Sequence, residues 1–142
     1  MGGRIMFLLE EDSHLPEVPA MPIDVATPIR ILSQEEFHAL DRRIMGIVFQ
    51  IHNEFGRFLD ERVFKSIIAA RCLTAGIQPV EAEVRIRVAH ESFVKDYGMD
   101  LLFESGSMLE AKCAETLTPA HRGQGMNYLF LTEMKHGRLV NL

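Results

Sequence analysis

The spacing of apolar residues changes partway along this chain, and that change constrains the fold more than any other feature. Between residues 34 and 55, apolar side chains recur every three or four positions, the period of an amphipathic helix: Phe37, Leu40, Ile44, Ile47, Val48 and Ile51. From Val80 to Val88 they recur every second position, the period of a half-buried strand. The chain therefore combines helices with a sheet, an α/β arrangement.

Local signals mark the ends of the helices. Ser33 and Glu36 form a capping box before the first helix, and Gly56 ends it. A second helix is predicted at about residues 60–75. A third helix opens with Thr118 as N-cap and Pro119 as first helical residue.

Strands are predicted at residues 80–89, 92–103, 107–114 and 137–142. The expected order is helix, helix, three strands, helix, strand. This order gives a mixed sheet of about four strands flanked by helices.

Residues 1–33 differ from the rest of the chain. Four prolines interrupt them, no hydrophobic period persists, and one short strand is predicted within "RIMFLL" at residues 4–9. Two interpretations stay open: a partly disordered tail, or an extended arm that packs on a partner chain. The domain itself is expected to span residues 34–142.

Composition sets limits on function. The net charge of -5 over 142 residues argues against a surface coated with basic groups, although 15 Lys and Arg could still line a local groove. Cys72 and Cys113 have no metal-type spacing, which favours reduced thiols and a cytoplasmic protein. No apolar run is long enough to span a membrane, and no aromatic stacking platform for bases is evident.

Three charged residues stand in stretches that otherwise predict buried strand. Asp100 precedes the turn "ESGS", and Glu110 and Lys112 follow it. A three-residue turn at Ser105 to Ser107 would pair residue 104 with 108 and bring Asp100 opposite Lys112. Two carboxylates on one face can hold Mg²⁺, which would activate water beside a phosphate. From spacing alone, a plain ion pair between Lys112 and an acid is the alternative.

Four motifs in order resemble one known family. They are "IVFQIHNEFGRFLDERVFKSII", "GMDLLFESGSMLEAKC", "LTPAHRGQGMNYL" and "GRLVNL". Together they resemble the GxxExxY family, a branch of the PD-(D/E)XK nuclease-like superfamily, from about Asp41 to Leu142. The resemblance implies a restriction-endonuclease-like core and a Mg²⁺-dependent nuclease, with Mn²⁺ as an alternative metal.

The resemblance also implies site residues. Asp100 and Glu110 match the metal-binding carboxylates, with Glu61 assisting the metal, and Lys112 matches the catalytic lysine. Gln124 matches a residue that supports the site.

Other residues are candidates for contacting nucleic acid. Tyr128 lies four residues after Gln124, so both share a helix face. His121 could approach a phosphate or serve only the helix start, and His52 is a site residue or a packing residue. Arg57 could line a phosphate groove, although a solvated surface charge is the simpler interpretation.

Three positions depart from the family pattern. Phe58 stands at the Gly that names the family, Phe64 at its Tyr, and Gly98 at a common Arg. These departures keep a second hypothesis open: a nuclease-fold module that binds nucleic acid or protein without useful catalysis. A homodimer is a third, with the N-terminal arm or an open edge at the last strand pairing with a second copy.

Overall fold

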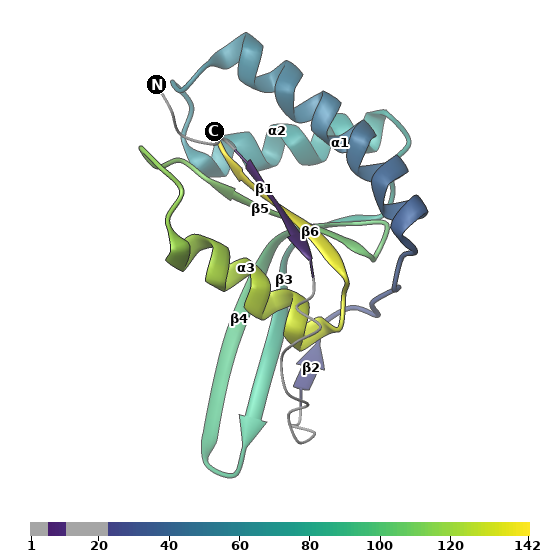
Figure 1. Ribbon diagram of the computed structural model, residues 1–142, viewed down its shortest axis with the longest axis vertical. Coiled ribbons are helices and arrows are strands. Elements are labelled where there is room, and N and C mark those ends of the chain that lie inside the picture. The colour runs from purple at the N-terminus through teal and green to yellow at the C-terminus, as the bar shows by residue number, and fades with distance from the viewer. Residues whose placement is uncertain (1–5, 11–22) are drawn as a thin grey trace.

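The structure is a computed structural model that describes residues 6–10 and 23–142. Within these residues three helices pack on one sheet of six strands (Figure 1). The elements in chain order are β1 Met6–Glu10, β2 Ile23–Val25, α1 Gln34–Phe55, α2 Glu61–Thr74, β3 Val80–His90, β4 Phe93–Phe103, β5 Ser107–Lys112, α3 Pro119–Thr132 and β6 His136–Asn141.

The sheet is mixed, with the strand order β1-β6-β5-β4-β3-β2. Only β5 and β6 run parallel, and α3 makes the crossover between them. All other neighbouring pairs are antiparallel. Figure 1 shows α1 and α2 above the sheet, α3 below it, and the β3–β4 hairpin extending past the rest of the molecule.

The expected α/β class and the order of helices and strands from residue 34 onward are confirmed. Ser33 forms its capping box with Glu36, and Thr118 caps α3. Gly56 ends α1 with φ of +61°, a backbone conformation that favours glycine. The strand expected within residues 4–9 is also present, as β1.

The expected strand count of about four is too low, because the N-terminal arm supplies two more strands. β1 adds to one side of the sheet through β6, and β2 adds to the other side through β3. The two segments lie at opposite edges of one sheet, which the irregular sequence before residue 33 did not indicate. The expectation of partial disorder falls on residues 1–5 and 11–22, outside the described residues.

The expectation of an open edge at the last strand is wrong. β6 lies inside the sheet, with β1 antiparallel on one side and β5 parallel on the other. Its backbone groups are therefore paired on both sides, and no second copy is needed to cover them.

Apolar side chains fill both sides of the sheet. One cluster lies between α1, α2 and the sheet and includes Phe37, Phe64 and Phe103, each at most 1% exposed. The second cluster lies between α3 and the sheet and includes Leu129 and Leu139. Within the part of the chain that the structure describes, no helix is both long and apolar enough to cross a membrane.

One buried ion pair ties α1 to the sheet. Asp41 is 5% exposed, and Arg138 on β6 donates two hydrogen bonds to it, at 2.9 Å from Nε and 2.7 Å from Nη2. Such a two-point contact fixes both position and angle. It holds the N-terminal half of α1 against β6.

Candidate active site

The β4–β5 turn sets the positions of the two central carboxylates. The turn has three residues, Glu104 to Gly106, and pairs Phe103 with Ser107. The expected odd-length loop is therefore confirmed, but the expected register is wrong. The turn begins one residue earlier than predicted, because Glu104 and Ser105 take the positive φ angles. Continued along the strands, this register places Asp100 opposite Glu110.

The side chains of Asp100 and Glu110 replace backbone pairing at this point. The β4–β5 ladder ends at Leu101 and Leu109. Beyond it, the backbone N–H of Asp100 donates to Oε1 of Glu110 at 2.9 Å, and the backbone N–H of Ala111 donates to Oδ2 of Asp100 at 2.8 Å. Both carboxylates are buried, Asp100 at 7% and Glu110 at 2% exposure.

The burial of two adjacent carboxylates changes how they titrate. Burial, and then the charge of Asp100, raise the pKa of Glu110 to about 9. The hydrogen bond from the Asp100 N–H and the charge of Lys112 oppose this rise. Burial and the charge of Glu110 also raise the pKa of Tyr128 to about 12, so the phenol stays neutral beside the pair.

Lys65 of α2 is the cation closest to the pair. Its Nζ lies 3.3 Å from Oδ1 of Asp100, 2.9 Å from Oε1 of Glu83 and 3.9 Å from Oε1 of Glu61. Burial disfavours its charge, but hydrogen bonds and attraction from Glu83 and Asp100 outweigh burial and raise the pKa of Lys65. Lys65 therefore joins α2 to the strands that carry the carboxylates.

The remaining catalytic candidates lie around this centre. Glu61 is the first residue of α2 and reaches the centre through Lys65. Lys112 ends β5, half-buried, and its charge lowers the pKa of Glu110. Among the described residues, no group of three or more His, Cys, Asp or Glu side chains is arranged to hold a metal. Glu61 is thus not gathered with Asp100 and Glu110 into a three-carboxylate cluster.

Helix α3 presents the predicted Gln124 and Tyr128 pair. Nε2 of Gln124 donates to the Tyr128 hydroxyl at 2.9 Å, as the four-residue spacing predicts. Tyr128 is 2% exposed, whereas Gln124 is exposed. Tyr128 is therefore part of the core beside α3, and Gln124 is the member of the pair that solvent can reach.

Three further candidates remain: His121 belongs to a helix cap, His52 is half-buried and Arg57 is exposed. His121 belongs to the capping box of α3, because its Nδ1 accepts the Thr118 N–H and its own N–H donates to the Thr118 hydroxyl. Nδ1 of His52 is buried and has no hydrogen-bond partner in the described part of the protein. Arg57 is exposed in the α1–α2 loop. Cys113 directly follows β5, where strand alternation puts it on the face opposite Lys112 and predicts a buried thiol; the structure shows it exposed instead.

The carboxylate pair suits a hard divalent cation. Asp100 and Glu110 are buried together, yet Lys65 contacts only Asp100. Burial, and then the neighbouring charge of Asp100, raise the pKa of Glu110, so ionising both carboxylates together is unfavourable. A divalent cation would complete the site. With two protein carboxylates it would keep several positions for water and substrate oxygens, which is typical of Mg²⁺.

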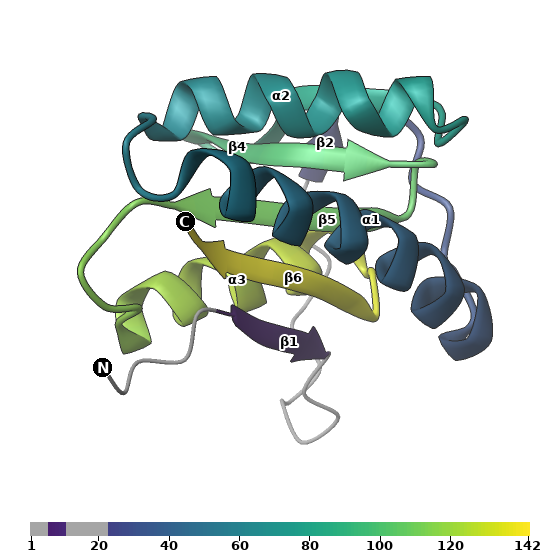
Figure 2. The ribbon, with the colours of Figure 1, turned by 90° about the horizontal axis from the view of Figure 1, so that it is seen from above.

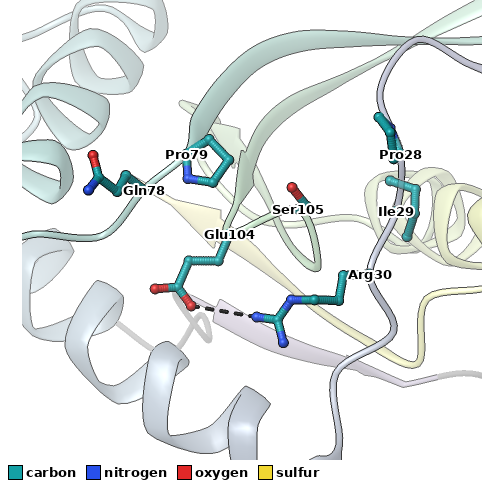
Figure 3. A pocket seen from close by; sticks show the side chains of 7 residues that line it. All are labelled: Pro28, Ile29, Arg30, Gln78, Pro79, Glu104 and Ser105. Carbon is teal, nitrogen blue, oxygen red and sulfur yellow. Dashed lines mark ion pairs between the residues drawn. The ribbon is translucent and has the colours of Figure 1, made fainter.

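A pocket lies apart from the carboxylate centre. It has a volume of about 390 Å³, lies beside the β4–β5 turn, and is crossed by an Arg30–Glu104 ion pair of 3.8 Å (Figure 3). Its lining residues are Pro28, Ile29, Arg30, Gln78, Pro79, Glu104 and Ser105. None of the candidate site residues lines it.

Sequence reasoning missed the roles of two residues. Lys65, like Arg57, has the sequence pattern of a solvated surface charge or a phosphate-groove residue, although its position four residues after Glu61 places both on one helix face. Glu83 was not considered. It stands between the pairs Ala82–Leu101 and Val84–Met99, which places it beside Asp100 on the neighbouring strand. Its φ of +50° marks a distortion that no sequence signal indicated.

A family model for the PD-(D/E)XK nuclease superfamily matches residues 38–142, well over half of the chain. Neither a curated protein nor a solved structure gives a significant match. The matched range begins within α1 and contains every later element from α2 to β6, including both strands that carry the carboxylate pair. The chain therefore belongs to the PD-(D/E)XK nuclease superfamily.

Proposed function

We propose that this protein is a metal-dependent nuclease that hydrolyses phosphodiester bonds of nucleic acid. The observation that supports this most strongly is the buried Asp100–Glu110 pair, whose two carboxylates lie opposite each other on neighbouring strands and exchange hydrogen bonds with the backbone. Membership of the nuclease superfamily supports the same reaction class. The four motifs favour the GxxExxY branch of that superfamily.

In this proposal Asp100 and Glu110 hold Mg²⁺, with Mn²⁺ as an alternative. The bound cation supplies an activated water and neutralises charge on the phosphate. Lys112 orients that water or stabilises the charge that develops on the phosphate. Gln124 reaches the substrate side, while Tyr128 fixes Gln124 through the 2.9 Å hydrogen bond.

One observation favours a second function, a nuclease-fold module that binds nucleic acid without efficient cleavage. Nζ of Lys65 already lies 3.3 Å from Oδ1 of Asp100, where it competes with a metal for that oxygen. No third acidic ligand is gathered within the described residues. A weak metal site would leave the fold able to bind but slow to cleave.

The test compares metal binding and cleavage in the same proteins. Mg²⁺ and Mn²⁺ are titrated calorimetrically into the wild type, Asp100→Ala and the control Asp96→Ala, an exposed carboxylate paired with Arg87 on the hairpin. The nuclease proposal expects saturable binding and metal-dependent cleavage of mixed DNA and RNA, both lost in Asp100→Ala and kept in Asp96→Ala. An absence of binding at millimolar metal together with an absence of cleavage contradicts it and favours the binding module.

The compartment and the assembly are part of the same proposal. Cys72 and Cys113 are both free thiols, which suits a reducing compartment such as the cytoplasm. The described N-terminal strands pair within their own sheet. Because β1 and β2 are the two edge strands of that sheet, a homodimer could still form at their outer edges, and sedimentation of the wild type would detect it.

A further inference from the structure

Phe58 lies in the α1–α2 loop with 95% of its surface exposed, the highest value among the exposed large apolar side chains of the described chain. A bulky aromatic ring is rarely left so open unless it has a partner. Its place is nonetheless defined. The ring lies within 3.6 Å of the point where a side chain on Gly56 would begin, and the loop continues directly into Asp60, the N-cap of α2.

The cations around Phe58 are unpaired, unlike most others in the protein. Arg57 and Arg62 are exposed on either side of it in the sequence, and their side chains make no hydrogen bond or ion pair within the described residues. Lys112 and Arg122 likewise have no side-chain hydrogen bond or ion pair there. Elsewhere the exposed arginines are mostly engaged by acids, as Arg87 is by Asp96.

These residues gather at one end of the molecule. In Figures 1 and 2 the α1–α2 loop, the end of β5 and the start of α3 lie on the same side. The charges of Glu61 and Asp60, at the start of α2, also raise the pKa of Cys113, which directly follows β5, after the larger effect of burial. The loop and the end of the site strand are therefore neighbours.

This end also adjoins the carboxylate centre. Phe58 precedes Glu61 by three residues, and Lys65, one helical turn further on, contacts Asp100. The rise of an α-helix puts Lys65 roughly 6 Å along the axis from Glu61, the first residue of α2, and Phe58 lies in the loop three residues before Glu61. A strand whose phosphate lies at Asp100 and Glu110 could thus reach Phe58 within a short stretch.

We propose that Phe58 stacks on an unpaired base and that Arg57 and Arg62 hold the adjoining phosphates, so that the protein selects single-stranded nucleic acid. This inference rests on the proposed function for the identity of the substrate. An exposed ring can stack only on a base whose face is free, and a duplex hides its base faces. The unpaired arginines provide the positive charge that a phosphate backbone needs, despite the net charge of -5.

Fluorescence anisotropy tests the stacking contact. A fluorescein-labelled dT 20-mer and a labelled 20-base-pair duplex are titrated with the wild type, Phe58→Ala, Phe58→Leu and Phe58→Trp in EDTA, so that neither metal nor cleavage contributes. Phe93→Ala is the matched control, because Phe93 is 56% exposed at the far tip of the hairpin. Circular dichroism verifies that each variant is folded.

The expected result is preferential binding of the 20-mer over the duplex. Phe58→Ala weakens it by about 5- to 100-fold, the range for losing one base–aromatic stack. Phe58→Leu also binds the 20-mer more weakly than the wild type, because leucine keeps apolar area but has no ring. Phe58→Trp and Phe93→Ala bind the 20-mer like the wild type. Equal affinity of Phe58→Ala and wild type overturns the inference, and so does a preference for duplex.

The contribution of the arginines is tested through salt. Arg57→Gln makes the negative slope of log K against log salt shallower by about 0.7 for a single strand, as the loss of one phosphate contact requires. Arg42→Gln, on an exposed arginine in the first half of α1, leaves the slope unchanged. Equal slopes for Arg57→Gln and wild type contradict the phosphate contact.

These results separate the two proposals. Phe58-dependent binding in a protein that cleaves nothing supports the inference and contradicts the nuclease proposal. Cleavage by a protein whose affinity for the 20-mer is the same in Phe58→Ala and wild type supports the nuclease proposal and contradicts the inference. A protein partner for this end, in place of nucleic acid, would leave oligonucleotide affinity unchanged in Phe58→Ala and so overturns the inference.

Discussion

The backbone N–H of Asp100 donates to the carboxylate of Glu110, so a side chain of β5 takes the place of a backbone acceptor. The reciprocal bond from Ala111 to Asp100 completes the exchange. The two strands are held at this point by the acids themselves. Asp100 and Glu110 therefore determine both how β4 is held to β5 at this point and where their own carboxylates lie.

The first prediction concerns the pH dependence of stability without metal. The folded pKa of Glu110 is raised to about 9 from an ordinary 4.5, so the folded state keeps a proton that the unfolded state releases. This contribution is fully present below pH 4.5 and is lost as pH rises toward 9, at up to about 1.4 kcal/mol per pH unit. Urea unfolding between pH 5 and 9 measures it.

Glu110→Gln should remove most of this dependence, because the amide does not titrate. At pH 8 we expect the variant to be more stable than the wild type by at least about 1 kcal/mol. Glu115→Gln, on an exposed carboxylate, serves as the control and should keep the wild-type slope. A Glu110→Gln protein with an unchanged slope would show that another group titrates.

The second prediction concerns Lys65 as a competitor of the metal. Lys65→Met removes the cation at 3.3 Å from Asp100, so Mg²⁺ should bind more tightly, by about tenfold for a contact near the surface. Calorimetric titration measures the affinity. Lys95→Met, which removes an exposed lysine lying over the Tyr97 ring, should bind Mg²⁺ like the wild type. Weaker binding in Lys65→Met would mean that Lys65 positions the carboxylates instead.

The third prediction concerns the ion pair between Asp41 and Arg138. Asp41→Ala leaves the arginine without its buried partner and should lower the free energy of unfolding by about 3 kcal/mol. Replacing both residues with Leu and Met should restore part of that loss, since no charge is then left unpaired. Chemical denaturation measures all three proteins. A double variant no more stable than Asp41→Ala would contradict the assignment of the loss to the unpaired arginine.

The fourth prediction compares two glycines. A Cβ on Gly106 would lie 2.4 Å from the backbone oxygen of Arg30 and 2.8 Å from Cγ of Leu32, so Gly106→Ala should destabilise the protein by about 1–3 kcal/mol. A Cβ on Gly123, within α3, would meet nothing within 4 Å. Gly123→Ala should therefore stabilise the protein by about 0.5–1 kcal/mol. Thermal unfolding of the two variants checks both signs, and a stable Gly106→Ala protein would refute the close approach.

The sequence predicted those parts of the fold that depend on local signals. The period of α1, its capping box at Ser33 and its end at Gly56 are all local, and each is confirmed. That the β4–β5 turn has an odd number of residues was predictable for the same reason. Its exact register was not, because the positive φ angles fell on Glu104 and Ser105 while Gly106 was needed for its contact with Arg30.

The sequence could not predict contacts between distant segments. β1 and β2 are too short and irregular to indicate which edge each would join, and both owe their place to partners far along the chain. In the same way, Lys65 could be placed near Glu61 from helix spacing, but its contact with Asp100 depends on how α2 crosses the sheet. Whether the contact between Lys65 and Asp100 is buried depends on tertiary packing, which local sequence signals do not specify.

The pairing of Met6 with Val140 also bears on how the chain reaches its folded state. During synthesis β1 is made first, yet the strand it joins is the last of the six to be made. Until then β1 has no neighbouring strand, and the closing of so long a loop makes its addition slow. The apolar segment Met6 to Leu9 therefore stays unpaired until β6 has been made, a period when a chaperone could bind it and when aggregation could begin.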